Sequence, residues 1–466
     1  MTTTNIAATK PRGFFSRIGN KQSWIAMGLL WGLFAMNGNM RSWAIGSLQP
    51  AIVKEFNVDP TTIGLFAGFV TLAQGLFAIP IAHWSDKGGA GWRRKYRYIA
   101  VVLAYVVLTI LTGVNIFTVS LLAVFILQFL QKVFSGAGEA LEVTNVTEWW
   151  PVEKRGFAQG LHHTSYPWGT FIGGLIIAGM LSAFGQDQWR MVFLILPLIS
   201  LPLLMMFWKF SSKKNYDKFT ADTLARGQTV PVGHGGADKV PAGALKRALK
   251  NPNVMITSLI MGLALAVYTG ISFWLPLYLA FVANFNLADT AALSVVFTIT
   301  GGVGQILWGS VSDKLGRKLT LIVLFIWLAI ALVLMQYIGL GIIALVGLQL
   351  LLGLATNGVY PVLYAMAADS IEPGAVGLAM GFNVAGQMIA AIGPIAVGAF
   401  IAAGGGFHDA SGYMVGLYVM AAAMLLCAVL MFLFTRETIG WFRKRDRALV
   451  SETSCLQGPL HAGAES

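Results

Sequence analysis

Long apolar runs alternate with short polar segments along almost the whole chain. Prolines, glycines and clusters of charge break the apolar sequence into twelve stretches, each long enough to cross the ~30 Å hydrocarbon layer of a membrane as an α-helix. We therefore expect an all-α membrane protein with twelve transmembrane helices. The pattern predicts them over residues 23–53, 61–84, 97–116, 118–147, 156–184 and 190–209, and again over 253–283, 288–311, 319–338, 341–368, 375–403 and 412–435.

A polar stretch interrupts this series in the middle. It contains SSKKNYDK and GHGGADK, which are too polar to lie in a bilayer, and it leaves six predicted helices on either side. We expect two pseudo-symmetric six-helix bundles joined by a cytoplasmic loop. The predicted domains are an N-terminal segment 1–22, a bundle 23–209, the loop 210–252, a bundle 253–435 and a tail 436–466.

The composition fits a membrane environment. Hydrophobic residues make up 56% of the chain and charged residues 11%, whereas soluble domains are roughly one quarter charged. The net charge of +12 is spread over short clusters between the apolar runs, so we expect anionic lipid headgroups rather than nucleic acid as its partner. The sequence has no P-loop, no HExxH and no paired cysteines. We therefore expect no cofactor, no metal and no enzymatic activity.

The basic clusters predict the orientation in the membrane. They lie in the N-terminal segment, after the second, fourth, eighth and last predicted helices, and in the middle loop. With twelve helices all of these positions fall on one side, and cytoplasmic loops are the ones enriched in Lys and Arg. We expect a multi-pass protein of the inner or plasma membrane with both termini in the cytoplasm.

Similar loops occur in the two predicted halves. HWSDKGGAGWRRK follows the second helix and GSVSDKLGRK follows the eighth, so that an aspartate, Asp86 or Asp313, and a basic cluster recur about half a chain apart. Short polar turns favour such residues in any case. Their joint position nevertheless indicates a six-helix repeat, an architecture known from transporters that bind substrate between the halves.

GSVSDKLGRK resembles the signature loop of the major facilitator superfamily, Gly-x-x-x-Asp-Arg/Lys-x-Gly-Arg-Arg/Lys, at every position, whereas the first loop is degenerate because Ala82 replaces the glycine. The helix count and the middle loop fit the superfamily as well. The resemblance implies a transporter whose halves rock by alternating access, with the aspartate bonded to a neighbouring helix and a basic residue as a gate. The candidate gating residues are Asp86, Arg93, Arg94, Gly309, Asp313, Gly316, Arg317 and Lys318, with Glu153 and Arg155 of PVEKRG.

Three further features resemble the anion:cation symporters, a branch of the superfamily that carries organic anions. They are an arginine in the first helix, GAGEA in the fourth and FWLPLYL in the seventh. The resemblance implies proton-coupled import of a sugar acid or another small carboxylate. Efflux of drugs or metabolites is the alternative, although the Gly-Pro element of that branch is missing from SYPWGTFIGG in helix 5. A membrane sensor on a transporter scaffold is a further alternative.

Arg41 interrupts the first apolar run. A guanidinium inside a membrane is costly unless it faces a cavity or an acid, so the residue is a candidate for function. It could hold a carboxylate or phosphate through two parallel hydrogen bonds. Alternatively, it pairs with Glu139 or Glu142, or reaches the membrane surface along its aliphatic stem.

The fourth predicted helix carries Lys132, Glu139 and Glu142. Lys132 and Glu139 are seven residues apart and therefore share a helix face, two turns from each other. We expect Glu139 to carry the proton, with Glu142, Lys132 and His163 as its neighbours, although a structural role stays open for each. The helix-4 arginine of the family aligns with either Gln128 or Lys132.

Polar and aromatic side chains inside the apolar runs complete the predicted substrate site, because lipid cannot satisfy their hydrogen-bonding groups. Hydrogen bonds between helices would explain the same residues equally well. We expect a monomer whose partners are a small organic anion, protons and the bilayer. The candidate substrate-binding residues are Arg41, Asn37, Gln74, Tyr268, Trp274, Asn357, Tyr360, Tyr364, Asn383 and Gln387.

Overall fold

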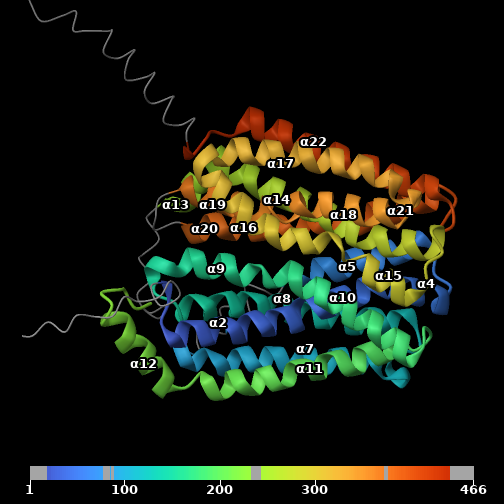
Figure 1. Cartoon of the computed structure of the whole chain (residues 1–466). Coiled ribbons are helices and arrows are strands. Elements are labelled where there is room, and N and C mark those ends of the chain that lie inside the picture. Colours follow the sequence, from blue (N-terminus) through green and yellow to red (C-terminus); the bar gives the residue numbers. More distant parts are fainter. Residues whose placement is uncertain (1–17, 77–83, 85–88, 232–242, 372–375, 441–466) are drawn as a thin grey trace, which may run out of the picture.

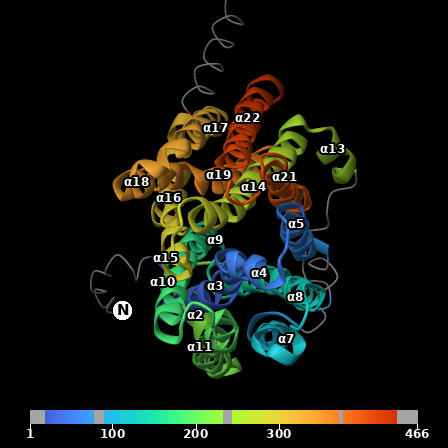
Figure 2. The same ribbon diagram turned by 90° about the vertical axis from the view of Figure 1, so that its right-hand side faces the viewer.

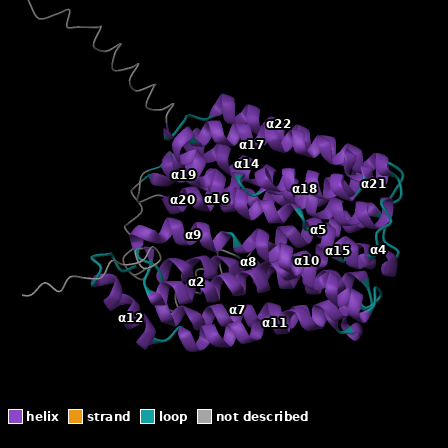
Figure 3. Ribbon diagram, in the orientation of Figure 1, coloured by secondary structure: helices purple, strands orange, loops and turns teal. Residues whose placement is uncertain are grey.

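The computed structural model describes residues 18–76, 84, 89–231, 243–371 and 376–440. Regular structure in these ranges is helical throughout (Figure 3). The helices run in two groups that lie side by side, with the N-terminal elements in one group and the C-terminal elements in the other (Figure 1).

The first group contains the elements from α2 to α11. They are α2 (Lys21–Leu33), the π-helical η1 (Phe34–Asn39), α3 (Met40–Ser47), α4 (Gln49–Phe56), α5 (Pro60–Leu76), η2 (Gly91–Arg94), α7 (Lys95–Gly113), η3 (Asn115–Phe117), α8 (Leu121–Glu148), η4 (Val152–Lys154), α9 (Arg155–His163), α10 (Ser165–Phe184) and α11 (Trp189–Phe210). We call this group the N-half.

The second group, which we call the C-half, contains the elements from α14 to α22. They are α14 (Pro252–Leu277), η5 (Tyr278–Val282), α15 (Leu287–Leu293), α16 (Phe297–Leu315), α17 (Arg317–Leu334), η6 (Met335–Leu340), α18 (Ile342–Thr356), α19 (Val359–Asp369), α20 (Val376–Gly386), η8 (Gln387–Ala391), α21 (Ile392–Ala403) and α22 (Ala410–Phe434). The connecting segment forms α12 (Lys213–Leu224) and α13 (Ala244–Lys250).

Ten helical stretches within the described ranges are long and apolar enough to cross a membrane. The first two predicted spans are the exceptions. The first is divided into α2, η1, α3 and α4, and the second, α5, reaches the limit of the described residues at Leu76. The all-helical membrane fold expected from the apolar runs is confirmed.

Polar residues at the helix starts explain where several of these helices begin. The side chains of Asn20, Ser120, Asn251 and Asp409 each accept a hydrogen bond from a backbone N–H in the first turn of the helix that follows. These groups would otherwise lack a partner, so such caps stabilise a helix end by about 1 kcal/mol.

The two halves meet mainly through α5 against α21 and α10 against α15 and α16. Glycines allow the backbones to approach closely there. A Cβ added at Gly64 would lie 2.8 Å from the carbonyl oxygen of Pro394, and one at Gly174 would lie 2.5 Å from Val295. We call the end of the molecule that carries α4 and α15 the α4 end, and the opposite end the α12 end (Figures 1 and 2).

The helix α12 is fixed to the N-half at the α12 end. The side-chain amide of Asn20 donates to the carbonyl oxygen of Phe219 at 3.2 Å and to the hydroxyl of Thr223 at 3.1 Å. The indole of Trp149 packs against Tyr216 and Phe219. The first part of the predicted middle loop is therefore an ordered cap on the first bundle.

Candidate functional site

A cavity of about 100 Å³ lies between the two halves. Phe66 of α5 and Pro394 of α21 line it next to the contact between the halves. The remaining lining mixes polar with apolar side chains, and both halves contribute to it. The polar lining residues are Gln49, Thr71, Gln128, Gln131, Lys132, Tyr166, Thr170, Tyr268, Thr269 and Ser272.

Lys132 brings a positive charge to this cavity from α8. The two glutamines near it are bound to α7 instead. The Nε2 of Gln128 donates to Thr112 and that of Gln131 to Thr109, each at 3.0 Å. Of the two residues that align with the family's helix-4 arginine, Lys132 is thus the one that supplies a cation.

Glu139 lies two turns further along α8 and keeps partial exposure. Its carboxylate accepts a hydrogen bond of 3.0 Å from the side chain of Gln74 on α5. The charges of Lys132, His163 and Glu142 all act on it. The acid that we predict to carry the proton therefore has Gln74 as its hydrogen-bond partner, a residue that we predicted to bind substrate.

A second acid and imidazole lie deeper in the N-half. Both Glu142 and His162 are buried, and 3.9 Å separates the carboxylate oxygen from Nε2 of the imidazole. The ring of His162 also packs against Phe34, at the start of the π-helical η1, with ring centroids 5.0 Å apart. His163 turns its Nδ1 to the carbonyl oxygen of Gln159 at 2.8 Å.

Asn37 and Arg41 lie on η1 and α3, in the segment that enters the same region. Their side chains lie outside the described part of the structure. The neighbouring Ile45 and Gly46 of α3 line the cavity, so the backbone brings this segment to the site.

A cluster of tyrosines lies where the two halves meet. The ring of Tyr166 on α10 lies 5.8 Å from that of Tyr268 on α14, which in turn lies 6.5 Å from that of Tyr360 on α19. Gln387 donates to the hydroxyl of Tyr364 at 2.8 Å. Tyr166 was not predicted, and SYPWG in helix 5 was the signal for it.

Asn357 and Asn383 are fully buried. Their side-chain amides have no hydrogen-bond partner within the described residues. Asn357 packs against Gly301, where an added Cβ would lie 2.4 Å from its Nδ2. Buried amides without partners are uncommon in native proteins, so both residues stay candidates for contact with a polar substrate.

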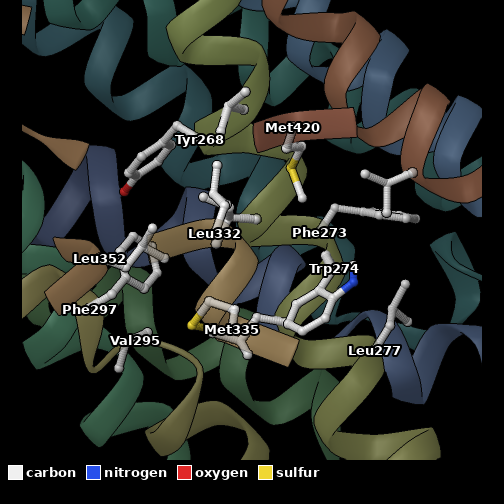
Figure 4. Close-up of a cluster of buried hydrophobic side chains, with 14 of the residues drawn as sticks. Tyr268, Phe273, Trp274, Leu277, Val295, Phe297, Leu332, Met335, Leu352 and Met420 are labelled. Atoms are coloured by element: carbon white, nitrogen blue, oxygen red, sulfur yellow. The ribbon is translucent and has the colours of Figure 1, made fainter. Parts of the chain in front are cut away.

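Trp274 has a different environment from the one predicted. Its indole is fully buried, donates to the carbonyl oxygen of Tyr413 at 2.9 Å and stacks on Tyr278 with ring centroids 4.9 Å apart. Figure 4 shows it inside the apolar cluster of the C-half, with Tyr268 at the edge of that cluster. Trp274 therefore joins α14 to α22, and we leave it out of the proposed site.

The gating loop of the C-half is built around Arg317 at the α12 end. Its guanidinium contacts Asp313 at 2.6 Å and Asp369 at 3.3 Å. The carboxylate of Glu437 accepts hydrogen bonds from the backbone N–H groups of Arg317 and Lys318, at 2.8 and 3.2 Å. Asp369 and Glu437 were not predicted, because they follow distant helices and carry no local signal.

The N-half has a comparable brace. The buried Arg94 pairs with Glu148 at 2.8 Å, and the same carboxylate accepts from the N–H of Gly91 at 2.8 Å. Arg93 packs its guanidinium over the ring of Trp92. Asp86, the predicted counterpart of Asp313, lies outside the described residues.

The predicted gating acid Glu153 contacts the connecting segment. Its carboxylate accepts from the N–H of Thr229 at 2.9 Å, and a hydrogen bond with the side chain of Thr229, helped by backbone hydrogen bonds, holds the pKa of Glu153 below its usual value. The backbone N–H of Val152 donates to the carbonyl oxygen of Thr229. The side chain of Arg155 is outside the described part. Gly309 lies within α16, and Gly316 ends that helix at a φ of 119°.

At the α4 end, contacts join one half to the other. The side-chain oxygen of Gln186 accepts from the N–H of Ala288 at 2.8 Å, and the ammonium of Lys54 lies 5.7 Å from the ring centroid of Phe281. Together with the helix pairs α5–α21 and α10–α15, these contacts close the molecule at this end.

The fold and the charged cavity between two packed bundles define a helical membrane transporter. The chain belongs to the Major Facilitator Superfamily, whose sequence profile matches residues 30–304 and 284–456. This confirms the superfamily that the loop GSVSDKLGRK indicated in the sequence.

The chain is also similar to two curated relatives and to one solved structure. It is 27% identical to the probable sulfoacetate transporter of Cupriavidus necator over 59% of this chain and 61% of that one. It is also 27% identical to a glucose-6-phosphate exchanger of Homo sapiens, over 64% and 65%. The chain thus spans less than two thirds of the length of either. A bacterial homolog to the human lysosomal transporter Spinster shares the fold, with a TM-score of 0.67 at 16% identity, over 89% of this chain and 97% of that one. These proteins are transporters, not enzymes.

Proposed function

We propose that this transporter imports a small organic anion, such as a sugar acid or another carboxylate, together with protons by alternating access. The observation that carries the proposal is the placement of Lys132 at the cavity, with Glu139 on the same helix and under its electrostatic influence. A cation for the substrate and an acid for the proton thus lie two turns apart on one helix. The named relatives carry anions too, which supports this substrate class.

The orientation in the membrane determines which side of it each end of the molecule faces. We place the α12 end in the cytoplasm, because the basic clusters of the sequence lie in its loops. The closed α4 end then faces outwards. Opening to the outside would separate α5 from α21 and α10 from α15.

The coupling follows from the cost of burying charge. Without substrate, Glu139 balances the charge of Lys132. An arriving anion takes over Lys132 and leaves the charge of the Glu139 carboxylate uncompensated among the membrane helices, which is unfavourable unless the acid takes up a proton. Anion and proton then cross together, and after the anion leaves, Glu139 gives up its proton on the same side and again balances the charge of Lys132.

The remaining candidates surround this pair. We assign contacts with the substrate to Arg41 and Asn37 from the first span and to Tyr268 and Tyr360, with Tyr166 added from the structure. In the C-half we retain Asn357, Tyr364, Asn383 and Gln387. Hydroxyl and amide groups of this kind suit a hydroxylated or oxygen-rich anion.

The test is uptake of labelled anions into proteoliposomes under an inward proton gradient. The panel contains sugar acids, monocarboxylates, dicarboxylates, sulfoacetate and glucose 6-phosphate. We expect one class to accumulate, Lys132→Gln and Arg41→Ala to weaken its binding about tenfold or more, and the control Lys54→Gln to leave binding intact. If no anion moves while neutral or cationic amphiphiles do, efflux replaces import as the function.

A further inference from the structure

The short helix α13 lies at the rim of the bundle at the α12 end. Seen along the bundle, it projects beyond α14 (Figure 2), and the view from the side places it at the end of the membrane helices (Figure 1). It packs on α14 and α20, with Ala244 and Ala248 fully buried. One face of this helix therefore adheres to the protein, and the others point away from it.

The corner between α13 and α14 is held firmly in place. Asn251 caps α14 and donates its side-chain N–H to the carbonyl oxygen of Ser370 at 2.6 Å. Asn253 donates to the hydroxyl of Ser370 at 2.9 Å and to the carbonyl oxygen of Arg436 at 3.0 Å. The direction in which α13 presents its outer faces is therefore set by the ends of α19 and α22.

The outer faces differ in character. Leu245 and Leu249 are 55% and 49% exposed, and the first turns of the adjoining α14 present an apolar surface with Met255 and Leu259, which are 36% and 39% exposed. Met255 and Leu259 belong to a membrane-spanning helix, so this surface faces acyl chains. At 100° per residue, the leucines and the basic residues occupy different faces of α13. The basic residues are Lys246, Arg247 and Lys250.

We propose that α13 and the first turns of α14 form a binding site for an anionic phospholipid. Leu245 and Leu249 contact the acyl chains at the membrane boundary, and Lys246 and Lys250 bind the phosphate and the anionic headgroup. Basic residues at such a surface attract anionic lipid, and an apolar face buried at the boundary adds to the binding. This site is separate from the substrate cavity and does not depend on which anion is transported.

The helix α12 provides a contrast within the same connecting segment. It also exposes lysines, but Asp217 and Asp222 lie among them, and Lys213 pairs with Asp217 at 2.9 Å. In α13 three basic residues occur without an acid. Charge complementarity to an anionic headgroup therefore favours α13.

The site can be tested by native mass spectrometry of the full-length protein. The protein is purified with an equimolar mixture of phosphatidylglycerol and phosphatidylcholine, and the retained lipid is counted for each variant. We expect selective retention of phosphatidylglycerol, weakened about tenfold or more in Lys246→Gln/Lys250→Gln. The matched control, Lys214→Gln/Lys218→Gln, removes two exposed lysines at the same spacing from α12 and is expected to retain the lipid. Equal loss in both pairs would overturn the assignment.

A second variant separates a lipid site from a site for a soluble anion. Leu245→Gln/Leu249→Gln keeps all the charges of α13 but removes its apolar contact, so we expect weaker retention of phosphatidylglycerol. Inorganic phosphate added in excess is expected not to displace the lipid. Displacement by phosphate together with full retention in the leucine variant would show that the residues bind a soluble anion instead.

Discussion

The need to compensate charge inside the membrane explains the roles of the site residues better than residue type alone. A lysine or glutamate inside a membrane protein needs a partner or a polar cavity. Two such residues lie two turns apart on α8. Gln74 holds Glu139, and Lys132 reaches the cavity. Polar residues that looked similar in the sequence serve different purposes, since the indole of Trp274 is committed to Tyr413.

At Lys132 we predict that charge, rather than volume, determines anion affinity. Lys132→Gln removes the cation and is expected to weaken binding about tenfold or more, since a hydrogen bond to a charged group is worth about 1.5–3 kcal/mol. Lys132→Arg is expected to retain most of the affinity. Binding of the transported anion measured by calorimetry checks both, and equal affinity in the glutamine variant would remove Lys132 from the site.

Glu55, at the α4 end beyond the membrane helices, gives a prediction about pH. The hydrogen bond from Arg190, followed by that from Trp189, lowers the pKa of this carboxyl below its usual value of 4.5, although burial opposes the effect. A lowered pKa in the folded state adds stability above the usual pKa, and this stability is lost as the pH falls through the folded value. Glu55→Gln should therefore destabilise the protein by about 0.2–1 kcal/mol at pH 7.

The effect of the same substitution should shrink as the pH falls from 7 through the lowered pKa of Glu55, because the native carboxyl then becomes protonated as well. Thermal unfolding of the two proteins in detergent, measured across this pH range, provides the comparison. A difference in stability that is independent of pH would show that the Glu55 carboxylate does not contribute through its charge.

At the scale of elements, glycines determine how closely the two halves approach at the α4 end. A Cβ at Gly68 would lie 2.4 Å from the side chain of Ile395 and 2.8 Å from the carbonyl oxygen of Ala391. Gly68→Leu should therefore push α5 away from α21 and shift the population toward a state open at this end. Distances between spin labels on the two halves measure the shift. Gly179→Leu is the control, because a Cβ at Gly179 has no neighbour within 4 Å.

The brace between Arg94 and Glu148 should behave as a buried ion pair. Arg94→Met leaves Glu148 as an unpaired buried charge and is expected to destabilise the N-half by about 3–5 kcal/mol. Removing both charges, in Arg94→Met/Glu148→Leu, should recover much of this loss. Thermal unfolding of the four proteins of the double-mutant cycle tests the coupling. Additive losses would mean that the pair does not stabilise this end as a unit.

For the molecule as a whole, the apolar runs were sufficient to predict most helices. The segments expected at 190–209 and 253–283 are observed at Trp189–Phe210 and Pro252–Val282, because burial in lipid requires a minimum apolar length. Breaks within a span were not predictable. The π-helical η1 and the interruption before α4 occur in a run whose polar residues, such as Asn37 and Arg41, predicted a binding site and gave no sign of a change in the helix.

The candidate site was predictable only where charge made residues conspicuous. Lys132 and Glu139 stand out as charges in an apolar helix, and Lys132 lines the cavity. Tyr166, Glu148 and Glu437 were missed, because aromatic rings are common in membrane helices and the partners of these acids are distant in sequence. Such contacts depend on how helices pack, which a single sequence does not specify.

The central claim is that anion and proton cross together through Glu139. It is tested most directly by recording the internal pH of proteoliposomes with a trapped dye when the transported anion is added outside, with no imposed gradient. We predict acidification of the interior with the unmodified protein. Glu139→Gln should give no acidification while it still exchanges labelled anion across the membrane. Anion uptake without any change of internal pH in the unmodified protein would contradict the account.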